Sequence, residues 1–227
     1  DGEEKEAIYV SKFANIVEND RAYSLGMKLP RNYITFDQAV AACKAKGNGL
    51  HLNQTGIFAV LNLLSQKMGT VPHGNTNYGK DYYHAYEHGI QPQGETGRTL
   101  TGSGGPTWYH NHDMSGIADL NGNVWEWTGG FRLMNGEIQI IPYGNCMKLD
   151  CDMSEDSTLW KAIMPNGSLV APGTAGTLKI DQTSATAGIR INTTVQYPTS
   201  GDTYRYIPFK TLTAESGVTI PKLLIAL

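Results

Sequence analysis

Only two segments of this 227-residue chain have the apolar periodicity of amphipathic helices, and they are neighbours in the sequence. A capping-box pattern at Thr35 precedes apolar residues at helical spacing, which predicts a helix over 36–46. A second helix is predicted from Asn53 or Thr55 to Gly69, where the glycine ends it. We therefore expect an α+β fold in which the two helices pack on a common core.

Short β-prone pieces lie on either side of these helices. Residues 8–10 and 22–25 are expected to form an opening hairpin, because residues 18–20 between them supply turn chemistry. Further along, Asn135-Gly136 is a strong hairpin turn signal, and the alternating residues 137–141 after it predict a strand. The sheet is thus expected to be built from short strands.

Glycine-rich and polar stretches divide the chain. Residues 74–106 are rich in Gly, Asn, Tyr and Thr without periodicity, which predicts long ordered loops. Residues 142–205 are rich in Gly, Ser, Thr and Pro with short β-prone pieces, and we interpret them as a β-rich insertion. We expect one domain over 1–227, made of a core at 7–140, a final helix at 219–227 and this insertion.

Composition excludes several classes of protein. The 18 Lys and Arg residues against 21 Asp and Glu give a net charge of −3 without a basic run, which argues against a nucleic-acid partner. No stretch approaches the roughly 20 apolar residues that span a bilayer, so membrane insertion is not expected. Three cysteines are too few for a disulfide framework. Cys146 and Cys151 could form a disulfide, half a metal site or two unreactive thiols, and we favour the last.

The most informative segment runs over residues 116–128, with the sequence GIADLNGNVWEWT. Asn121-Gly122 is a tight turn that would lead into a strand. Period two then places Trp125 and Trp127 on one face, where two indoles form a large apolar anchor. We predict that both rings are buried against the two helices.

Two carboxylates flank the same turn. Asp119 and Glu126 could converge with the carbonyl groups of Gly122 and Val124 on a hard cation, because calcium prefers several oxygen ligands around a flexible loop. Alternatively, Glu126 hydrogen-bonds the turn and Asp119 is solvated. Both interpretations remain open on the sequence.

The wording of this segment closely resembles the GNVWEW motif of the sulfatase-modifying, formylglycine-generating-enzyme family, whose fold is C-type-lectin-like. The resemblance covers roughly residues 7–140, and residues 49–58 are similar to the family's entry into its second core helix. It implies a structural role for four residues of the motif, namely Asn121, Asn123, Trp125 and Trp127. It also implies calcium as the ion at the turn, because some members hold calcium with the matching residues.

Within that family the chain is most similar to the variable proteins of diversity-generating retroelements, many of which are phage tail proteins. The short sequence segments that show this similarity include residues 9–12, 21–25, 75–79, 97–102 and 137–142. The resemblance implies a display scaffold in a phage tail or on a bacterial surface. It also implies a homo-oligomer that binds a host-surface or environmental macromolecule. We expect the variable C-terminal region to be absent from this sequence, so no ligand-binding residue is assigned.

The same resemblance bears on catalysis. The family's enzymes carry their reactive cysteines in the C-terminal stretch, and Cys146 and Cys151 lie too early to match them. We therefore expect no enzyme and assign no catalytic residue. The alternatives are a cysteine oxidase of the formylglycine-generating type and a purely structural tail component.

Two histidine patterns resemble metal-binding motifs, but the residues around them do not support a metal site. Residues 84–88 match the H-x-x-E-H pattern of zinc peptidases, which requires a helix. Gly89 and Pro92 follow at once, so we interpret the match as chance. His110 and His112 more simply hydrogen-bond the backbone of a loop.

Overall fold

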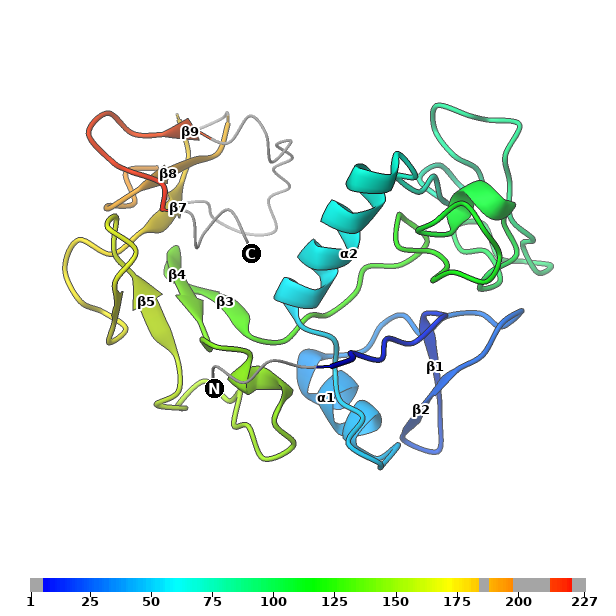
Figure 1. Cartoon of the computed structure of the whole chain (residues 1–227), viewed down its shortest axis with the longest axis horizontal. Coiled ribbons are helices and arrows are strands. Elements are labelled where there is room, and N and C mark those ends of the chain that lie inside the picture. The colour runs from blue at the N-terminus through cyan, green and yellow to red at the C-terminus, as the bar shows by residue number, and fades with distance from the viewer. Residues whose placement is uncertain (1–5, 184–187, 198–212, 222–227) are drawn as a thin grey trace. The chain divides into compact units, whose positions relative to one another are not determined.

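The computed structural model describes residues 6–183, 188–197 and 213–221. The chain divides into two compact units, an N-terminal unit, Gly2–Thr128, and a C-terminal unit, Gly129–Leu227. In the described residues both α-helices lie in the N-terminal unit and most of the strands in the C-terminal unit (Figure 1). The structure thus confirms the mixed class of helix and sheet. That the chain is one lectin-like domain stays a prediction.

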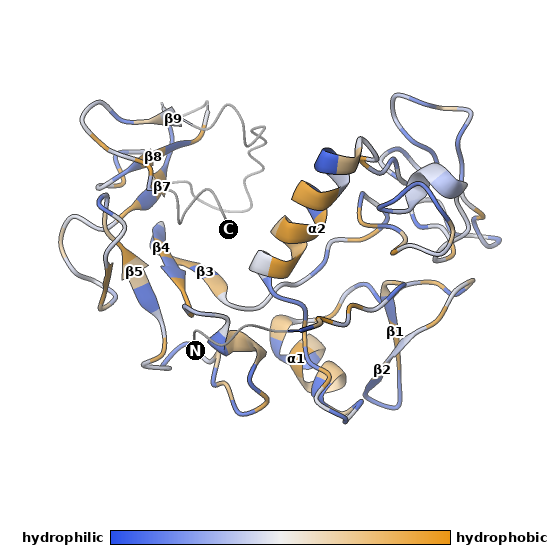
Figure 2. Cartoon of the chain, in the orientation of Figure 1, coloured by the Kyte–Doolittle hydropathy of each residue, from blue (hydrophilic) through white to orange (hydrophobic). Residues whose placement is uncertain are grey.

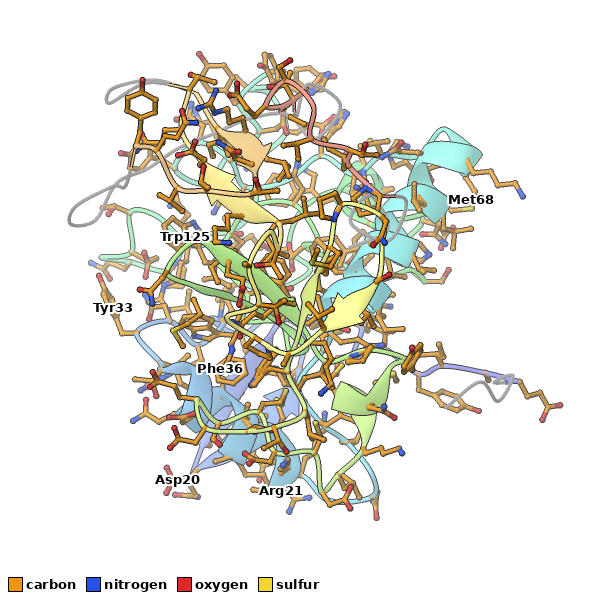
Figure 3. All side chains as sticks on the ribbon, turned by 90° about the vertical axis from the view of Figure 1, so that its left-hand side faces the viewer. Asp20, Arg21, Tyr33, Phe36, Met68 and Trp125 are labelled. Carbon is orange, nitrogen blue, oxygen red and sulfur yellow. The ribbon has the colours of Figure 1, made fainter. Side chains whose placement is uncertain are left out.

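The N-terminal unit opens with a β-hairpin of strands β1 (Asn15–Glu18) and β2 (Arg21–Ser24). Its two turn residues, Asn19 and Asp20, both have positive φ, at 49° and 56°, as a tight hairpin turn requires. Asp20 and Arg21 lie together at the tip (Figure 3). The predicted hairpin and its turn are confirmed, but the predicted first strand at 8–10 was wrong. A two-residue turn pairs the residues that directly precede it, which are Asn15–Glu18.

Helix α1 (Phe36–Lys44) forms as its sequence predicted. The Thr35 hydroxyl accepts a hydrogen bond from the Gln38 amide at 3.3 Å, and the Gln38 side chain accepts one from the Thr35 amide at 3.1 Å. This capping box satisfies two donors that the first turn leaves unpaired. The buried face of α1, made of Ala39, Ala42 and Cys43, packs against β2.

Helix α2 (Thr55–Met68) also lies where it was predicted, and Gly69 ends it in the left-handed conformation at φ 70°. Hydrophobic residues occupy most of its length (Figure 2). Only Ile57, Leu61 and Ser65 are buried, however, whereas Val60, Leu64 and Met68 are exposed. The predicted common core of the two helices was wrong for the described residues, because the apolar cluster around α1 contains no residue of α2.

The C-terminal unit begins with the hairpin of β3 (Phe131–Met134) and β4 (Glu137–Ile140). Asn135 and Gly136 form its turn with φ of 50° and 80°, so Met134 pairs with Glu137. The turn signal and the strand predicted at 137–141 are confirmed.

In the part of this unit that the structure describes, short strands complete a seven-stranded sheet in the order β6-β5-β4-β7-β8-β9, with β3 paired to β4. All pairs are antiparallel except the pair β8 and β9. The remaining strands are β5 (Lys161–Ile163), β6 (Leu169–Val170), β7 (Lys179–Asp181), β8 (Arg190–Asn192) and β9 (Thr213–Ala214). Strands β5 to β8 lie in the segment 142–205 that was predicted to be β-rich, while its residues 184–187 and 198–205 lie outside the described residues. That the segment is an insertion stays a prediction.

The sheet carries the main apolar core. The centre of this cluster is completely or almost completely buried and consists of Ile138, Ile140, Ile163, Leu178 and Ile191. Phe131, Val218 and Ile220 pack around it. Of the predicted helix at 219–227, residues 219–221 are described and are not helical, while 222–227 lie outside the described residues.

Candidate functional site

The loops of the N-terminal unit are held together by the side chain of Asn123. Its carbonyl oxygen accepts hydrogen bonds from the Thr99 amide at 2.8 Å and from the Asn75 side chain at 3.2 Å, and its amide group donates to the Thr99 carbonyl at 3.2 Å. Its own backbone amide donates to the Asn75 carbonyl at 2.8 Å. One side chain thus joins three loops that are far apart in the sequence.

The glycines around this junction allow the loops to approach closely. Gly122 has φ 78° and lies against the Asn75 carbonyl, where a Cβ would collide. Gly74 lies against the Asn121 carbonyl in the same way. Asn121 also donates from its side chain to the Pro72 carbonyl at 3.1 Å. Both asparagines of the motif therefore bind neighbouring loops, and the Asn-Gly turn is a tight junction between backbones.

The two tryptophans of the motif are not where the sequence placed them. Trp125 is 82% exposed and Trp127 is 50% exposed, so the prediction that both are buried was wrong. Residues 124–128 belong to no strand, and the period-two argument therefore does not apply to them. Trp127 still contacts the start of α1: its ring meets the Phe36 ring edge-on at 5.9 Å, and its indole nitrogen donates to the Ile34 carbonyl at 2.9 Å.

Asp119, the first carboxylate of the predicted calcium site, is buried and has φ 58°. Its Oδ2 accepts a hydrogen bond from the Gly102 amide at 2.7 Å, whereas its Oδ1 has no hydrogen-bond partner in the described residues. Burial raises the pKa of Asp119 to about 6, against the opposing effect of the Gly102 amide. A buried carboxylate with one unsatisfied oxygen favours either a proton or a cation.

Glu126, the second carboxylate, lies on the other side of the turn and is exposed as a residue. Protein atoms surround its carboxyl closely enough that desolvation, and then the charge of Asp119, raise its pKa to about 7. Because part of the residue is open to water, the desolvation of this carboxyl is incomplete. The Gly122 carbonyl accepts from the Val124 amide at 2.9 Å and keeps a second lone pair. The four predicted ligands present only oxygen, as calcium prefers.

A second cluster of polar side chains lies in the loop from 71 to 90, and sequence reasoning missed it. Glu87 accepts from His73 Nδ1 at 2.9 Å and from the Thr107 hydroxyl at 2.8 Å. Burial acts to raise the pKa of Glu87, but the hydrogen bonds from Thr107 and His73 outweigh it and lower the pKa. Glu87 is therefore ionised at neutral pH and holds His73 in one orientation.

Asp81 holds the second histidine of this cluster. Its Oδ1 accepts from His84 Nδ1 at 3.0 Å and from the backbone amides of Tyr83 and His84 at 2.9 and 2.8 Å, and its Oδ2 accepts from the Gly74 amide at 3.2 Å. Burial acts to raise the pKa of Asp81, but these hydrogen bonds lower it overall. The His73 and His84 rings then stack, with centroids 3.9 Å apart and planes at 8°. No local sequence pattern predicts the stacked histidines. The orientation of His73 depends on Glu87, which is 14 residues away in the sequence.

The zinc-peptidase interpretation of 84–88 was expected to fail, and the structure agrees. The segment is a loop, and His84 and Glu87 bind Asp81 and His73 instead of facing one another on a helix. Within the described ranges, no three or more His, Cys, Asp or Glu side chains are grouped so as to hold a metal ion.

The cysteines of the C-terminal unit pack as apolar residues. Cys146 and Cys151 are buried in one cluster with Ile141 and Trp160, and no disulfide joins them. Burial, and then the neighbouring Cys151, raise the pKa of Cys146 to about 11. Its sulfur is therefore a thiol at neutral pH and a poor nucleophile.

Comparison with known proteins does not show which family the chain belongs to. No protein-family model matches the chain, and no curated protein matches it significantly. In the part of the chain that the structure describes, no helix is both long and apolar enough to cross a membrane.

Replacing Asn123 should test the loop junction directly. Asn123→Gly keeps the left-handed backbone conformation accessible but leaves the Thr99 and Asn75 groups without partners, so we expect a loss of about 2–4 kcal/mol in the free energy of unfolding. Urea denaturation measures this loss. Tyr9→Ala is the control, and because the ring is 89% exposed it should change stability by less than about 0.5 kcal/mol. Equal losses in the two variants would contradict the assignment.

Proposed function

We propose that this chain is a ligand-binding display scaffold with a C-type-lectin-like fold, of the kind found in variable proteins of diversity-generating retroelements. It acts on a phage tail or a bacterial surface, as a homo-oligomer, and binds a host-surface or environmental macromolecule through a surface near its C-terminal end. The proposal includes no catalysis, no nucleic-acid partner and no insertion into a membrane. Its lectin-like fold and its retroelement relationship rest on the resemblance of residues 116–128 and the words around them.

The observation that supports the scaffold role is the construction of the loops between α2 and Thr128. They contain almost no regular secondary structure, yet buried polar side chains fix them. Besides the Asn123 junction, the Thr101 hydroxyl donates to the Leu25 carbonyl at 2.6 Å, and Asp119 binds the Gly102 amide. Long loops in a folded domain are mostly functional, and fixing them in advance lowers the entropic cost of binding.

The thiol chemistry favours binding over the rival cysteine oxidase. Such an enzyme needs a thiolate nucleophile, and nucleophilic cysteines have lowered pKa values. Cys146 has a raised pKa, and Cys43 has one as well, chiefly because of burial. These cysteines are thus suited to packing rather than to catalysis.

Binding to intact cells tests the proposed function. The full chain, labelled with a fluorophore, is titrated onto a panel of bacterial strains and onto protein-free liposomes. We expect saturable binding to at least one strain, reversed by excess unlabelled chain, and none to liposomes. Absence of saturable binding to every strain, or equal binding to cells and liposomes, would count against a receptor-binding role.

We also propose calcium as the ion at the turn before Trp125, held by the Asp119 and Glu126 carboxylates and the Gly122 and Val124 carbonyls. The unsatisfied Asp119 Oδ1 supports this donor set, because an ion would supply its missing partner. Asp119 also raises the pKa of Glu126, and a divalent cation would remove that repulsion. The ion would orient the turn and supply no chemistry.

Thermal unfolding with calcium and with a chelator tests this site. Both carboxyls have raised folded-state pKa values, so their ionisation destabilises the fold, and this contribution diminishes as the pH falls through about 7 and then about 6. Calcium competes with those protons. We therefore expect added calcium to raise the Tm at about pH 8 and to have little effect at about pH 5.

Glu126→Gln should abolish the calcium effect, whereas Glu18→Gln, which changes an exposed carboxylate of the first hairpin, should preserve it. If the parent chain melts at one temperature with and without calcium at about pH 8, the carboxylates bind no ion and the proposal is wrong.

A further inference from the structure

Three exposed tyrosines lie within five consecutive residues, 82–86, of the loop that carries the stacked histidines. Tyr82, Tyr83 and Tyr86 are 64%, 87% and 79% exposed. The Tyr82 and Tyr83 rings meet edge to face at 5.0 Å, and the Tyr86 ring meets the His84 ring edge to face at 6.1 Å. We name these three tyrosines, with His84 and His73, the tyrosine–histidine surface. Exposed aromatic rings gathered in this way mark interaction surfaces.

The loop beneath these rings is fixed before any ligand arrives. The buried Asp81 carboxylate accepts the amides of Tyr83 and His84, and the Tyr82 amide donates to the Thr76 hydroxyl at 2.9 Å. The Asp81 amide donates to the Glu87 carbonyl at 3.1 Å, which closes the loop. The tyrosine side chains therefore lose little further backbone entropy when a ligand binds.

The histidines of the surface offer hydrogen-bond acceptors. The ionised Asp81 and Glu87 carboxylates only accept, so each histidine must carry a proton on Nδ1. In the neutral ring Nε2 then has a lone pair, and no hydrogen bond within the described residues engages Nε2 of His73 or His84. Together with the phenol groups, the surface combines aromatic faces with neutral donors and acceptors.

Charge and side-chain type narrow the class of ligand. In residues 80–88 the only exposed formal charge is Lys80, because Asp81 and Glu87 are engaged by the histidines. A single lysine does not make an anion site, which uses several cations or an arginine fork. The same stretch contains no Ile, Leu, Val or Met, so its tyrosines are its only large side chains with an apolar face besides the histidine rings. A sugar ring, with apolar C–H faces and hydroxyl groups at its edge, matches both components of the surface.

The ring geometry argues against a metal ion on the two histidines. A nitrogen lone pair lies in the plane of its ring, and an ion would have to lie in both planes at about 2.0–2.1 Å from each nitrogen. The two planes are nearly parallel and their centroids are 3.9 Å apart. One ion cannot satisfy both rings unless the stack is broken.

We propose that the tyrosine–histidine surface binds a neutral glycan through its pyranose rings, with the tyrosine faces against the C–H groups and the His73 and His84 Nε2 atoms accepting from hydroxyl groups. This surface lies in the N-terminal unit and shares no residue with the proposed ion site at Asp119. It does not depend on the retroelement relationship, so either proposal can fail without the other.

The full chain is titrated with neutral hexasaccharides of glucose, mannose, galactose and N-acetylglucosamine, and binding is measured by saturation-transfer NMR and calorimetry. A heparin hexasaccharide serves as the anionic probe. We expect at least one neutral oligosaccharide to bind with a Kd in the millimolar range or below, in chelator as well as in calcium, and heparin to bind more weakly. Saturation transfer should reach the sugar C–H protons.

Tyr83→Ala should weaken this binding about tenfold, as expected for loss of one stacked ring, without lowering the Tm. Tyr33→Ala is the matched control, because Tyr33 is 95% exposed elsewhere in the N-terminal unit. Its binding should equal that of the parent chain. The proposal is overturned if no neutral sugar binds, if heparin binds more tightly, if binding requires calcium, or if Tyr33→Ala weakens binding as much as Tyr83→Ala.

Discussion

The hydrogen bonds of the Asn123 side chain are the constraint on which the N-terminal unit depends. They join the loops at Asn75 and Thr99 to the motif segment, where neither helix nor sheet supplies a framework. The apolar cluster of this unit, around Ala22, Ala42 and Cys43, is small. Buried polar side chains therefore fix these loops, together with the buried rings of Trp108 and Tyr109. Most of their polar atoms are paired, because an unpaired buried polar group costs more than its hydrogen bond contributes. In the described residues of this unit, the exceptions include Asp119 Oδ1 and the Thr99 hydroxyl.

The hydrogen-bonded loops of the N-terminal unit connect the fold to the proposed functions. Loops fixed by hydrogen bonds leave their outer side chains free to face solvent, as the tyrosines near Asp81 do. Asp81 and Glu87 are structural for the loop and also orient His84 and His73. The same carboxylates thus stabilise the loop and fix the orientation of the histidines at its surface. Asp119 likewise accepts a hydrogen bond from the Gly102 amide through Oδ2. Its Oδ1 has no partner in the described residues and is a ligand of the proposed ion.

The sequence predicted those elements whose causes are local. The capping box at Thr35, the glycine after Met68 and the Asn135-Gly136 turn act within a few residues, and all three are confirmed. The exposure of Trp125 and Trp127 could not be predicted in this way, because the prediction of burial assumed a strand that the segment does not form. The stacked histidines depend on a contact between His73 and Glu87 that no periodicity encodes. Local sequence signals therefore predicted the helices and turns. The candidate site depends on polar contacts between residues far apart in the sequence, which those signals do not predict.

The central claim is that buried side chains fix the loops of the N-terminal unit, and amide hydrogen exchange tests it most directly. The amides of Gly79, His84, Thr99 and Gly102 donate to the side chains of Asn75, Asp81, Asn123 and Asp119, although none lies in a helix or strand. We predict that these four amides exchange far more slowly than the exposed amides of the same loops, and that Asn123→Gly accelerates Thr99 most. Exchange of all four at the rate of an unstructured peptide would contradict the account.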